Sequence, residues 1–178
     1  VMGLAPYGKS EYCYDKIKQI IDIDESNPLK FKNKMDTFKP LFQVKLHNLL
    51  AGQRFDNIAA ATQQWFENLV TRWIKNAIKQ TGIHKIACSG GSFLNVKANQ
   101  KILSLPEVDD TFFCPAAGDD GLAVGAALIG YFEMTIMSGR KPEKTSLQSI
   151  YFGTAFSNDE ISEILKKHDL LKNSQYFD

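Results

Sequence analysis

Two loops contain residues whose types and spacing suit the binding of an anion and its counter-ion. In the first, the apolar residues 86–88 lead into a Ser-Gly-Gly turn at residues 89–91. This layout is typical of a strand, a tight turn and a helix whose free backbone N–H groups bind anions. The second loop, residues 111–121, has the same layout but contains Asp119 and Asp120. We predict that both loops face one nucleotide, the first at phosphate and the second at a metal ion.

Polar side chains after the glycine turn are candidates for contact with the same ligand. Ser92, Asn95 and Asn99 are spaced three and four residues apart, which makes them neighbours on one face of a helix. Amides in the first turns of such a helix can hydrogen-bond a ligand held above its start. The alternative is that these amides are only solvated.

The two adjacent aspartates have two roles open to them. At a helix start, Asp119 or Asp120 would cap free N–H groups and complement the helix dipole. Beside a phosphate site, hard oxygen ligands would also hold Mg²⁺ or a similar cation that bridges to phosphate. The neighbouring glycine turn favours the second role, because nucleotide phosphates need both hydrogen-bond donors and a countercharge.

Several common motifs do not fit these loops. A P-loop would need glycine at position 95, where asparagine stands, and no G-x-G-x-x-G follows the strand. A nucleophile elbow would need glycine at position 94, where leucine stands. The spacing of His47 and His84 to Ser89 supports no catalytic triad. Serine hydrolysis is therefore not the favoured chemistry.

The elements that position these loops follow from periodicity. Apolar residues recur at spacings of three, four and seven over residues 54–81, which predicts a long amphipathic helix with its aromatic residues in the core. Asp56 is the predicted N-cap of this helix. Gly82 is predicted to end the helix in the left-handed conformation. Another helix is expected over residues 119–137, where interior glycines indicate close packing against a second backbone.

Shorter elements are expected before the long helix. Residues 12–21 have helical spacing, and residues 20–23 alternate as a short strand. A turn containing Pro28 then leads to residues 29–31, which would return as the second strand of a hairpin. Residues 32–40 are polar and are predicted to be a loop.

A second part of the chain is expected to begin near Lys144. Ser157 and Glu160 have the spacing of a capping box and open a last helix. We therefore assign residues 1–144 to one domain and residues 145–178 to a linker and the start of a following domain.

Composition restricts the class of protein. The chain has 178 residues and a net charge of +1, so nothing indicates nucleic acid or a membrane surface as partner. Its longest apolar run, residues 122–132, is shorter than the roughly 20 residues of a membrane-spanning helix. Cys13, Cys88 and Cys114 are too scattered for a disulfide framework, which favours a cytoplasmic location. Because the chain opens on Val1 inside a motif, we expect it to be part of a longer protein.

Four motifs, taken in order, resemble the NodU/CmcH-type carbamoyltransferases. These motifs are residues 2–8 (MGLAPYG), 56–63 (DNIAAATQ), 89–95 (SGGSFLN) and 115–121 (PAAGDDG). The tail, residues 151–157 (YFGTAFS), is similar to the family segment that leads out of the first domain. The resemblance covers nearly the whole chain.

The resemblance implies an α/β fold of the actin/hexokinase/Hsp70 type, which is ribonuclease-H-like, followed by an extension toward a YrdC-like domain. In the family, the YrdC-like domain makes a carbamoyl-adenylate from ATP and carbamoyl phosphate. The region that matches this chain holds the adenylate while the carbamoyl group passes to a hydroxyl of a small molecule. ATP and a divalent metal of the Fe²⁺ or Mg²⁺ class are the implied cofactors, and a homodimer is compatible with the resemblance.

The motif match also implies site residues. The nucleotide would contact Gly90, Gly91, Ser92, Asn95 and Gly118, and the metal would bind Asp119. The chain differs from the usual family pattern at two positions of the glycine turn, where Ser92 and Phe93 replace valine and alanine. Thr154 replaces a common proline. The family's pair of metal-binding histidines has no counterpart among His47, His84 and His168, so the catalytic residues are unknown.

Two other functions fit the same residues. A sugar-kinase-like phosphotransferase of the same fold would use Asp119 in phosphoryl transfer, and it would not require carbamoyl phosphate. A non-catalytic nucleotide-binding module would bind nucleotide without turnover of a hydroxyl acceptor.

Overall fold

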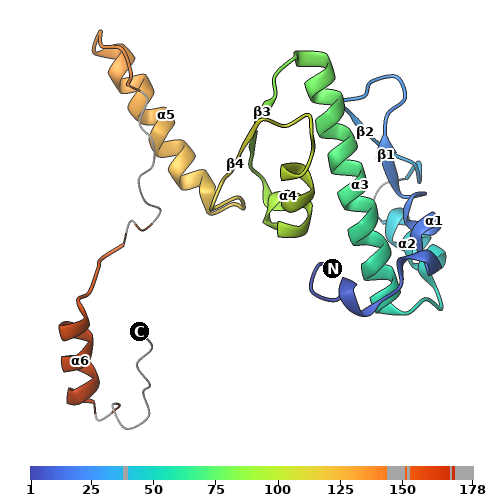
Figure 1. The fold of residues 1–178 in the computed structure, drawn as a ribbon, viewed down its shortest axis with the longest axis horizontal. Helices are drawn as coiled ribbons and strands as arrows, with labels where there is room; N and C mark the ends of the chain where they lie inside the picture. Colours follow the sequence, from blue (N-terminus) through green and yellow to red (C-terminus); the bar gives the residue numbers. More distant parts are fainter. Residues whose placement is uncertain (38–39, 144–150, 152, 169, 171–178) are drawn as a thin grey trace. The chain divides into compact units, whose positions relative to one another are not determined.

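The chain divides into two compact units. The computed structural model describes residues 1–37, 40–143, 151, 153–168 and 170 (Figure 1). The first unit is Val1–Arg140 and the second is Lys141–Asp178. The sequence predicts a domain boundary near Lys144, which lies outside the described residues.

Short elements surround one long helix in the first half of the first unit. In chain order they are η1 (Ala5–Tyr7), η2 (Ser10–Tyr12), α1 (Tyr14–Ile17), β1 (Ile21–Ile23), β2 (Phe31–Asn33), α2 (Leu41–Leu50) and α3 (Phe55–Thr81). Strands β1 and β2 pair antiparallel, with Ile23 opposite Phe31. The predicted hairpin is therefore confirmed, although its second strand starts two residues later than expected.

One helix of this region is shorter than predicted, and another was not predicted. The helix expected over residues 12–21 is limited to Tyr14–Ile17, preceded by the 3-10 turn η2. Helix α2 was not expected from the sequence. It buries none of its residues, although Leu50 packs partly buried against the core.

Helix α3 ends as predicted but begins differently. Gly82 follows it with a φ of 66°, the left-handed conformation expected at this position. The N-cap position belongs to Arg54, whose backbone is extended, and not to Asp56. Asp56 lies in the first turn of the helix, where its carboxylate accepts hydrogen bonds from the Asn57 N–H and the Arg54 guanidinium.

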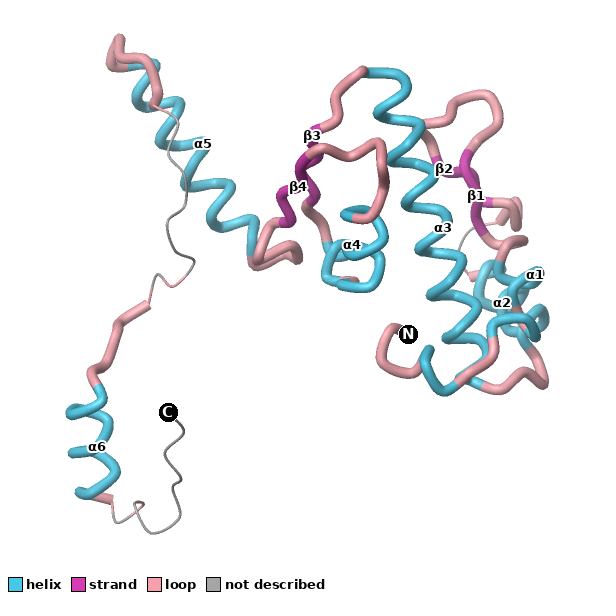
Figure 2. The backbone as a smooth tube through the Cα atoms, viewed as in Figure 1, coloured by secondary structure: helices cyan, strands magenta, loops and turns pink. Residues whose placement is uncertain are grey.

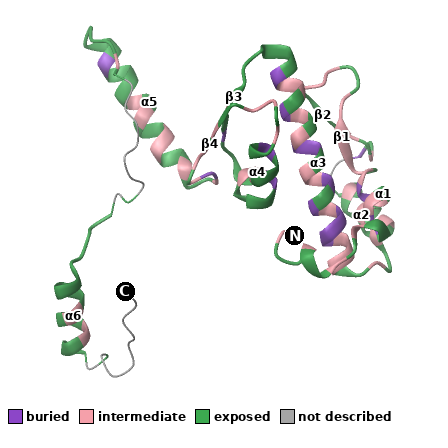
Figure 3. Ribbon diagram, in the orientation of Figure 1, coloured by how far each residue is buried: buried purple, intermediate pink, exposed green. Residues whose placement is uncertain are grey.

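The core lies along both halves of α3, as the buried segments in Figure 3 show. One cluster of buried residues consists of Cys13, Ile17, Ala61, Trp65 and Leu69. A second consists of Val70, Ile74, Ile78, Ala98 and Ile102. The indole N–H groups of α3 also hold the hairpin, because Trp65 Nε1 donates to Ile21 O at 3.0 Å and Trp73 Nε1 donates to Leu29 O at 2.9 Å.

A pair of parallel strands follows α3, drawn in magenta in Figure 2. Strand β3 (Lys85–Cys88) pairs with β4 (Asp110–Phe113), with Lys85 opposite Asp110 and Cys88 opposite Phe113. Between them lie the 3-10 turn η3 (Gly91–Leu94) and helix α4 (Val96–Leu103). Both predicted strands are confirmed. In a parallel pair the carboxyl ends lie at one edge, so the two candidate loops start side by side.

Helix α5 (Gly121–Met137) follows the second loop. At Gly121 a Cβ would overlap the carbonyl oxygen of Ala116, which belongs to the loop leading into α5 and not to the neighbouring element that the sequence predicts. At Gly125 and Gly130 a Cβ would meet open space within the described residues, so the prediction is wrong for these two positions. Thr135 is the one residue that α5 buries among the described part of the chain.

The second unit contains helix α6 (Asn158–Lys167). Its predicted capping box is confirmed, because Ser157 Oγ accepts from the Glu160 N–H at 3.2 Å and the Ser157 N–H donates to Glu160 Oε2 at 2.7 Å. None of the helices in the described ranges has the length and apolar character needed to cross a membrane. The predicted mixed α/β class is confirmed, and the actin/hexokinase type of fold remains a prediction.

Candidate functional site

The two loops predicted to face one ligand are in direct contact. The Gly90 N–H donates to Ala117 O at 2.8 Å, and the Cys114 N–H donates to Cys88 O at 2.9 Å. Together the loops and the start of α5 line a pocket of about 590 Å³, a size usual for small-molecule sites. The pairing of β3 with β4 thus joins two motifs that are far apart in the sequence.

Four of the six predicted site residues line this pocket, which we call the glycine-turn pocket. They are Gly90 and Gly91 from the first loop and Gly118 and Asp119 from the second. The lining also includes Ser89, Ala117, Gly121, Leu122, Gly125, Ala126 and Ile129.

The structure separates the two aspartates that the sequence could not tell apart. Asp119 is exposed and lines the pocket, whereas Asp120 does not line it. Asp120 Oδ1 instead lies 3.0 Å from the place where a Cβ on Gly118 would stand. Asp120 has the N-cap position of α5 but makes no side-chain cap hydrogen bond, so the capping role predicted for one aspartate is wrong.

The two glycines of the turn are required for different reasons. Gly90 has a φ of 104° and a ψ of 151°, a conformation open essentially to glycine alone. Gly91 has an ordinary φ, and a Cβ added there would meet no atom of the described residues within 4 Å. Neither backbone strain nor packing therefore explains the glycine at position 91. Its missing side chain leaves room for a ligand to approach the backbone.

The helix after the turn does not begin where the sequence suggested. The 3-10 turn η3 comes first, and α4 starts only after Asn95. Asn95 Oδ1 accepts from the Ala98 N–H at 3.1 Å and so caps α4. The backbone N–H groups of Gly91 and Ser92 in this turn have no hydrogen-bond partner among the described residues.

Ser92 and Asn95 do not line the glycine-turn pocket. The Asn95 amide forms two hydrogen bonds with the Gln63 amide of α3, at 2.8 and 3.0 Å. Asn99 Nδ2 donates to Phe93 O at 2.8 Å, and its Oδ1 is buried without a partner in the described structure. The predicted polar face of Ser92, Asn95 and Asn99 is thus divided among different contacts.

Ser92 belongs to a second pocket, on the α3 side of the same turn. This apolar pocket has a volume of about 420 Å³. Its lining comes from the hairpin, α3 and the turn, and consists of Ile21, Phe31, Phe66, Leu69, Val70, Trp73, Ser89, Gly90, Ser92 and Phe93. This pocket is not predictable from the sequence, because its aromatic residues follow the same stripe of α3 as the core residues. Phe66 and Trp73 are only half-buried, which the periodicity of α3 cannot reveal.

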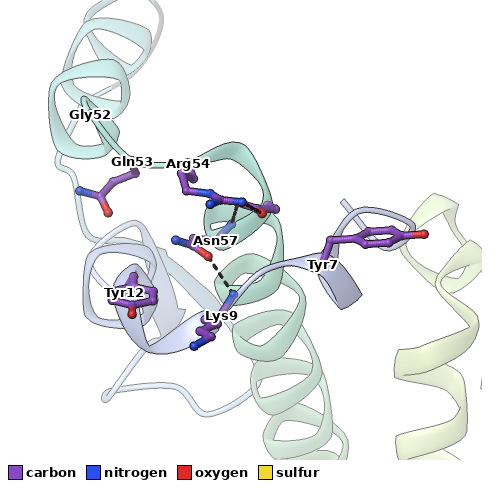
Figure 4. Close-up of a pocket in the computed structure, with 8 residues that line it drawn as sticks. Tyr7, Lys9, Tyr12, Gly52, Gln53, Arg54 and Asn57 are labelled. Atoms are coloured by element: carbon purple, nitrogen blue, oxygen red, sulfur yellow. Dashed lines mark hydrogen bonds and ion pairs between the residues drawn. The ribbon is translucent and has the colours of Figure 1, made fainter.

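A third, polar pocket of about 480 Å³ lies between the N-terminal segment and the start of α3 (Figure 4). Gly8 is needed here, because a Cβ would overlap the Asp56 carbonyl. The Lys9 N–H donates to Asn57 Oδ1 at 2.8 Å. The hydrogen bond from the Arg54 side chain holds the pKa of Asp56 below its ordinary value. The first two sequence motifs are therefore in contact, which the sequence did not predict.

The described residues provide one candidate metal ligand at the site. They contain no group of three or more histidine, cysteine, aspartate or glutamate side chains arranged to hold a metal ion. Mg²⁺ in nucleotide sites is commonly held by one or two carboxylates together with phosphate oxygens. A lone exposed Asp119 in the lining of this pocket fits that mode of binding.

Comparison with known proteins gives the family of the chain. Residues 1–128 match the family model described as the carbamoyltransferase N-terminus. The chain belongs to the carbamoyltransferase family. The resemblance based on the four sequence motifs is confirmed.

The curated relatives of this family member are much longer proteins. The nodulation protein NolO of Bradyrhizobium diazoefficiens is 29% identical over 168 residues, which cover 92% of this chain and 30% of the relative. An uncharacterized protein of Methanocaldococcus jannaschii is 29% identical over 173 residues, with 93% and 27% covered. The nodulation protein NolNO of Sinorhizobium fredii is 28% identical over 167 residues, with 92% and 24% covered. The chain thus spans less than a third of each of these relatives.

Proposed function

We propose that these residues form the nucleotide-holding part of an ATP-dependent O-carbamoyltransferase. The observation that carries the proposal is the contact of the two motif loops around the glycine-turn pocket, in a chain that belongs to the carbamoyltransferase family. In this proposal the chain holds a carbamoyl-adenylate, made from ATP and carbamoyl phosphate, while a small-molecule hydroxyl accepts the carbamoyl group.

The polar side of the turn suits the phosphate of the nucleotide. Gly91 leaves its backbone open to close approach, and the N–H groups of Gly91 and Ser92 are available as donors. Gly118 and Asp119 line the same pocket from the second loop. A divalent cation bound to Asp119 would supply countercharge to the phosphate.

The apolar pocket suits the purine base of the same nucleotide. Ser89 and Gly90 line both pockets, so one ligand that crosses the turn would enter both. The half-buried rings of Phe66, Trp73 and Phe93 offer apolar and stacking surface for a flat heterocycle. The ligand would thus place its base toward α3 and its phosphate toward Asp119.

This arrangement favours transfer by stabilising the leaving group. When the acceptor hydroxyl attacks the carbamoyl carbon, the bond from that carbon to the phosphate oxygen breaks and AMP leaves with the electron pair. Fixed backbone donors beside that phosphate stabilise its growing negative charge without reorganisation. The acceptor's proton must pass to a base that these residues do not identify.

Turnover assays on the intact protein test the proposal. We expect product only when ATP, carbamoyl phosphate, a divalent cation and a hydroxyl acceptor are all supplied. Phosphorylated acceptor formed from ATP alone would instead identify a sugar-kinase-like phosphotransferase. Tight ATP binding with no turnover on any hydroxyl acceptor would identify a nucleotide-binding module.

A further inference from the structure

The apolar pocket beside the glycine turn has walls made of aromatic rings. Trp73 of α3 and Phe31 of the hairpin form one pair, with ring centroids 5.4 Å apart and ring planes at 40°. Trp73 is held in place because its Nε1 donates to Leu29 O at 2.9 Å. Phe93 of the turn packs against Phe113 of β4, with centroids 6.4 Å apart. Neighbouring elements therefore fix the positions of the rings that a ligand would meet.

Few groups of this lining can form hydrogen bonds with a ligand. The indole N–H is already donated, and the other side-chain donors and acceptors among the described lining residues are the hydroxyls of Ser89 and Ser92. The Phe93 N–H donates to Gly90 O, and Phe93 O accepts from Asn99 Nδ2. No charged side chain and no side-chain amide belongs to this lining in the described part of the chain.

A lining of this kind selects a heterocycle by its flat face and only weakly by the groups on its edge. A site rejects an analogue strongly when buried polar groups of the site would lose their partners. A serine hydroxyl rotates to donate or to accept, so it can serve the amino group of adenine or the carbonyl group of guanine. Phe31 is 45% exposed and both serines are exposed, so water can also reach polar atoms at the edge of a base.

We propose that the site binds purine nucleotides by stacking and does not distinguish adenine from guanine. The inference rests on the proposed function, in which Ser89 and Gly90 belong to both pockets and one nucleotide enters both. Both purines have the flat face that stacking on the rings requires. The pocket has a volume of about 420 Å³, within the range of sites that hold larger ligands, so either purine has room. A pyrimidine has a single ring and gains less from the same walls.

Calorimetry on the intact protein with ATP, GTP and CTP, at one concentration of divalent cation, tests the inference. We expect the Kd values of ATP and GTP to agree within about fivefold, the difference that one net hydrogen bond makes. CTP should bind about tenfold more weakly, because its base covers less of the aromatic lining. A larger preference for either purine would overturn the inference, and so would CTP that binds as tightly as ATP. Failure of the intact protein to bind any of the three nucleotides would instead overturn the proposed function, and the inference with it.

Two substitutions separate stacking from recognition of the base edge. Phe31→Leu keeps an apolar side chain but removes a ring from the lining, so it should weaken the binding of ATP and of GTP by the same factor, about tenfold. Ser92→Ala removes a hydroxyl that serves either base, so it too should change both affinities by one factor. Phe55→Leu is the matched control, because Phe55 is an exposed phenylalanine that lines neither pocket. It should leave both affinities within about twofold of wild type.

Thermal unfolding must show that each variant is folded at the temperature of the binding measurement. A folded Phe31→Leu protein that binds both nucleotides like wild type would overturn the inference, because the base would then not stack in this pocket. A Ser92→Ala protein in which the ratio of ATP to GTP affinity changes more than about fivefold would also overturn it, since that hydroxyl would then distinguish the two bases.

Discussion

At the scale of single residues, the two glycines of the turn have separable roles. Gly90 is required by its backbone conformation, and Gly91 is not. We expect Gly90→Ala to destabilise the fold by about 1–3 kcal/mol, the cost of a side chain in such a region of φ and ψ. Gly91→Ala should leave stability nearly unchanged but weaken ATP binding, because its methyl group enters the pocket. Thermal unfolding measures the stability of both variants of the intact protein, and calorimetry measures their ATP affinity. Equal destabilisation by the two substitutions would contradict the separate roles of the two glycines.

The two adjacent aspartates give a second test at this scale. Asp119 lines the glycine-turn pocket and Asp120 does not. We expect Asp119→Ala to lose cation-dependent ATP binding and turnover while keeping the wild-type unfolding temperature. Asp120→Ala is the matched control and should keep cation dependence. If Asp119→Ala unfolded the protein, its role would be structural and the assignment as a ligand would be wrong.

At the scale of elements, an ion pair links α3 to the segment before β4. Lys75 Nζ lies 2.9 Å from Glu107 Oε1, and this hydrogen bond is the main cause that lowers the pKa of Glu107 below its ordinary 4.5. A lowered pKa in the fold stabilises the protein above pH 4.5, and that contribution is lost as pH falls through the folded value. Glu107→Gln should therefore unfold at a lower temperature than wild type at neutral pH.

The difference in unfolding temperature between wild type and Glu107→Gln should shrink as the pH falls below 4.5. Thermal unfolding followed by circular dichroism at a series of pH values measures it. Glu107 is partly exposed, so the difference is expected to be small. A difference that stays constant from neutral pH to well below 4.5 would show that the ion pair is not its source.

At the scale of elements, the sequence predicts best those features whose interacting residues are close together in the chain. Gly82 and the Ser157–Glu160 capping box were predicted correctly, because their partners lie within a few residues. The partner of Asn95 is 32 residues away on α3, so its spacing alone could not show that Gln63 already uses the amide. The apolar pocket was missed for a related reason, since periodicity shows which face of a helix is apolar but not whether it is filled.

At the scale of the whole molecule, the chain contains both loops of the candidate site but is much shorter than its curated relatives. It spans 24–30% of three curated relatives. Within the described residues, α5 leaves large apolar side chains such as Leu122 and Ile129 exposed beside the pocket. An exposed apolar lining of this kind suits contact with further protein that would close the pocket.

We therefore expect the isolated 178 residues to bind ATP weakly and to show no carbamoyl transfer, because a site open on one side neither excludes water nor fixes the ligand. The intact protein, assayed with the same ATP, carbamoyl phosphate, cation and acceptors, is the positive control. Calorimetry measures ATP affinity for both proteins, and product formation measures turnover. Circular dichroism must show that the isolated chain is folded, so that weak binding reflects an incomplete site. Efficient turnover by the 178 residues alone would contradict this prediction and would place every catalytic group, including the unidentified base, within them.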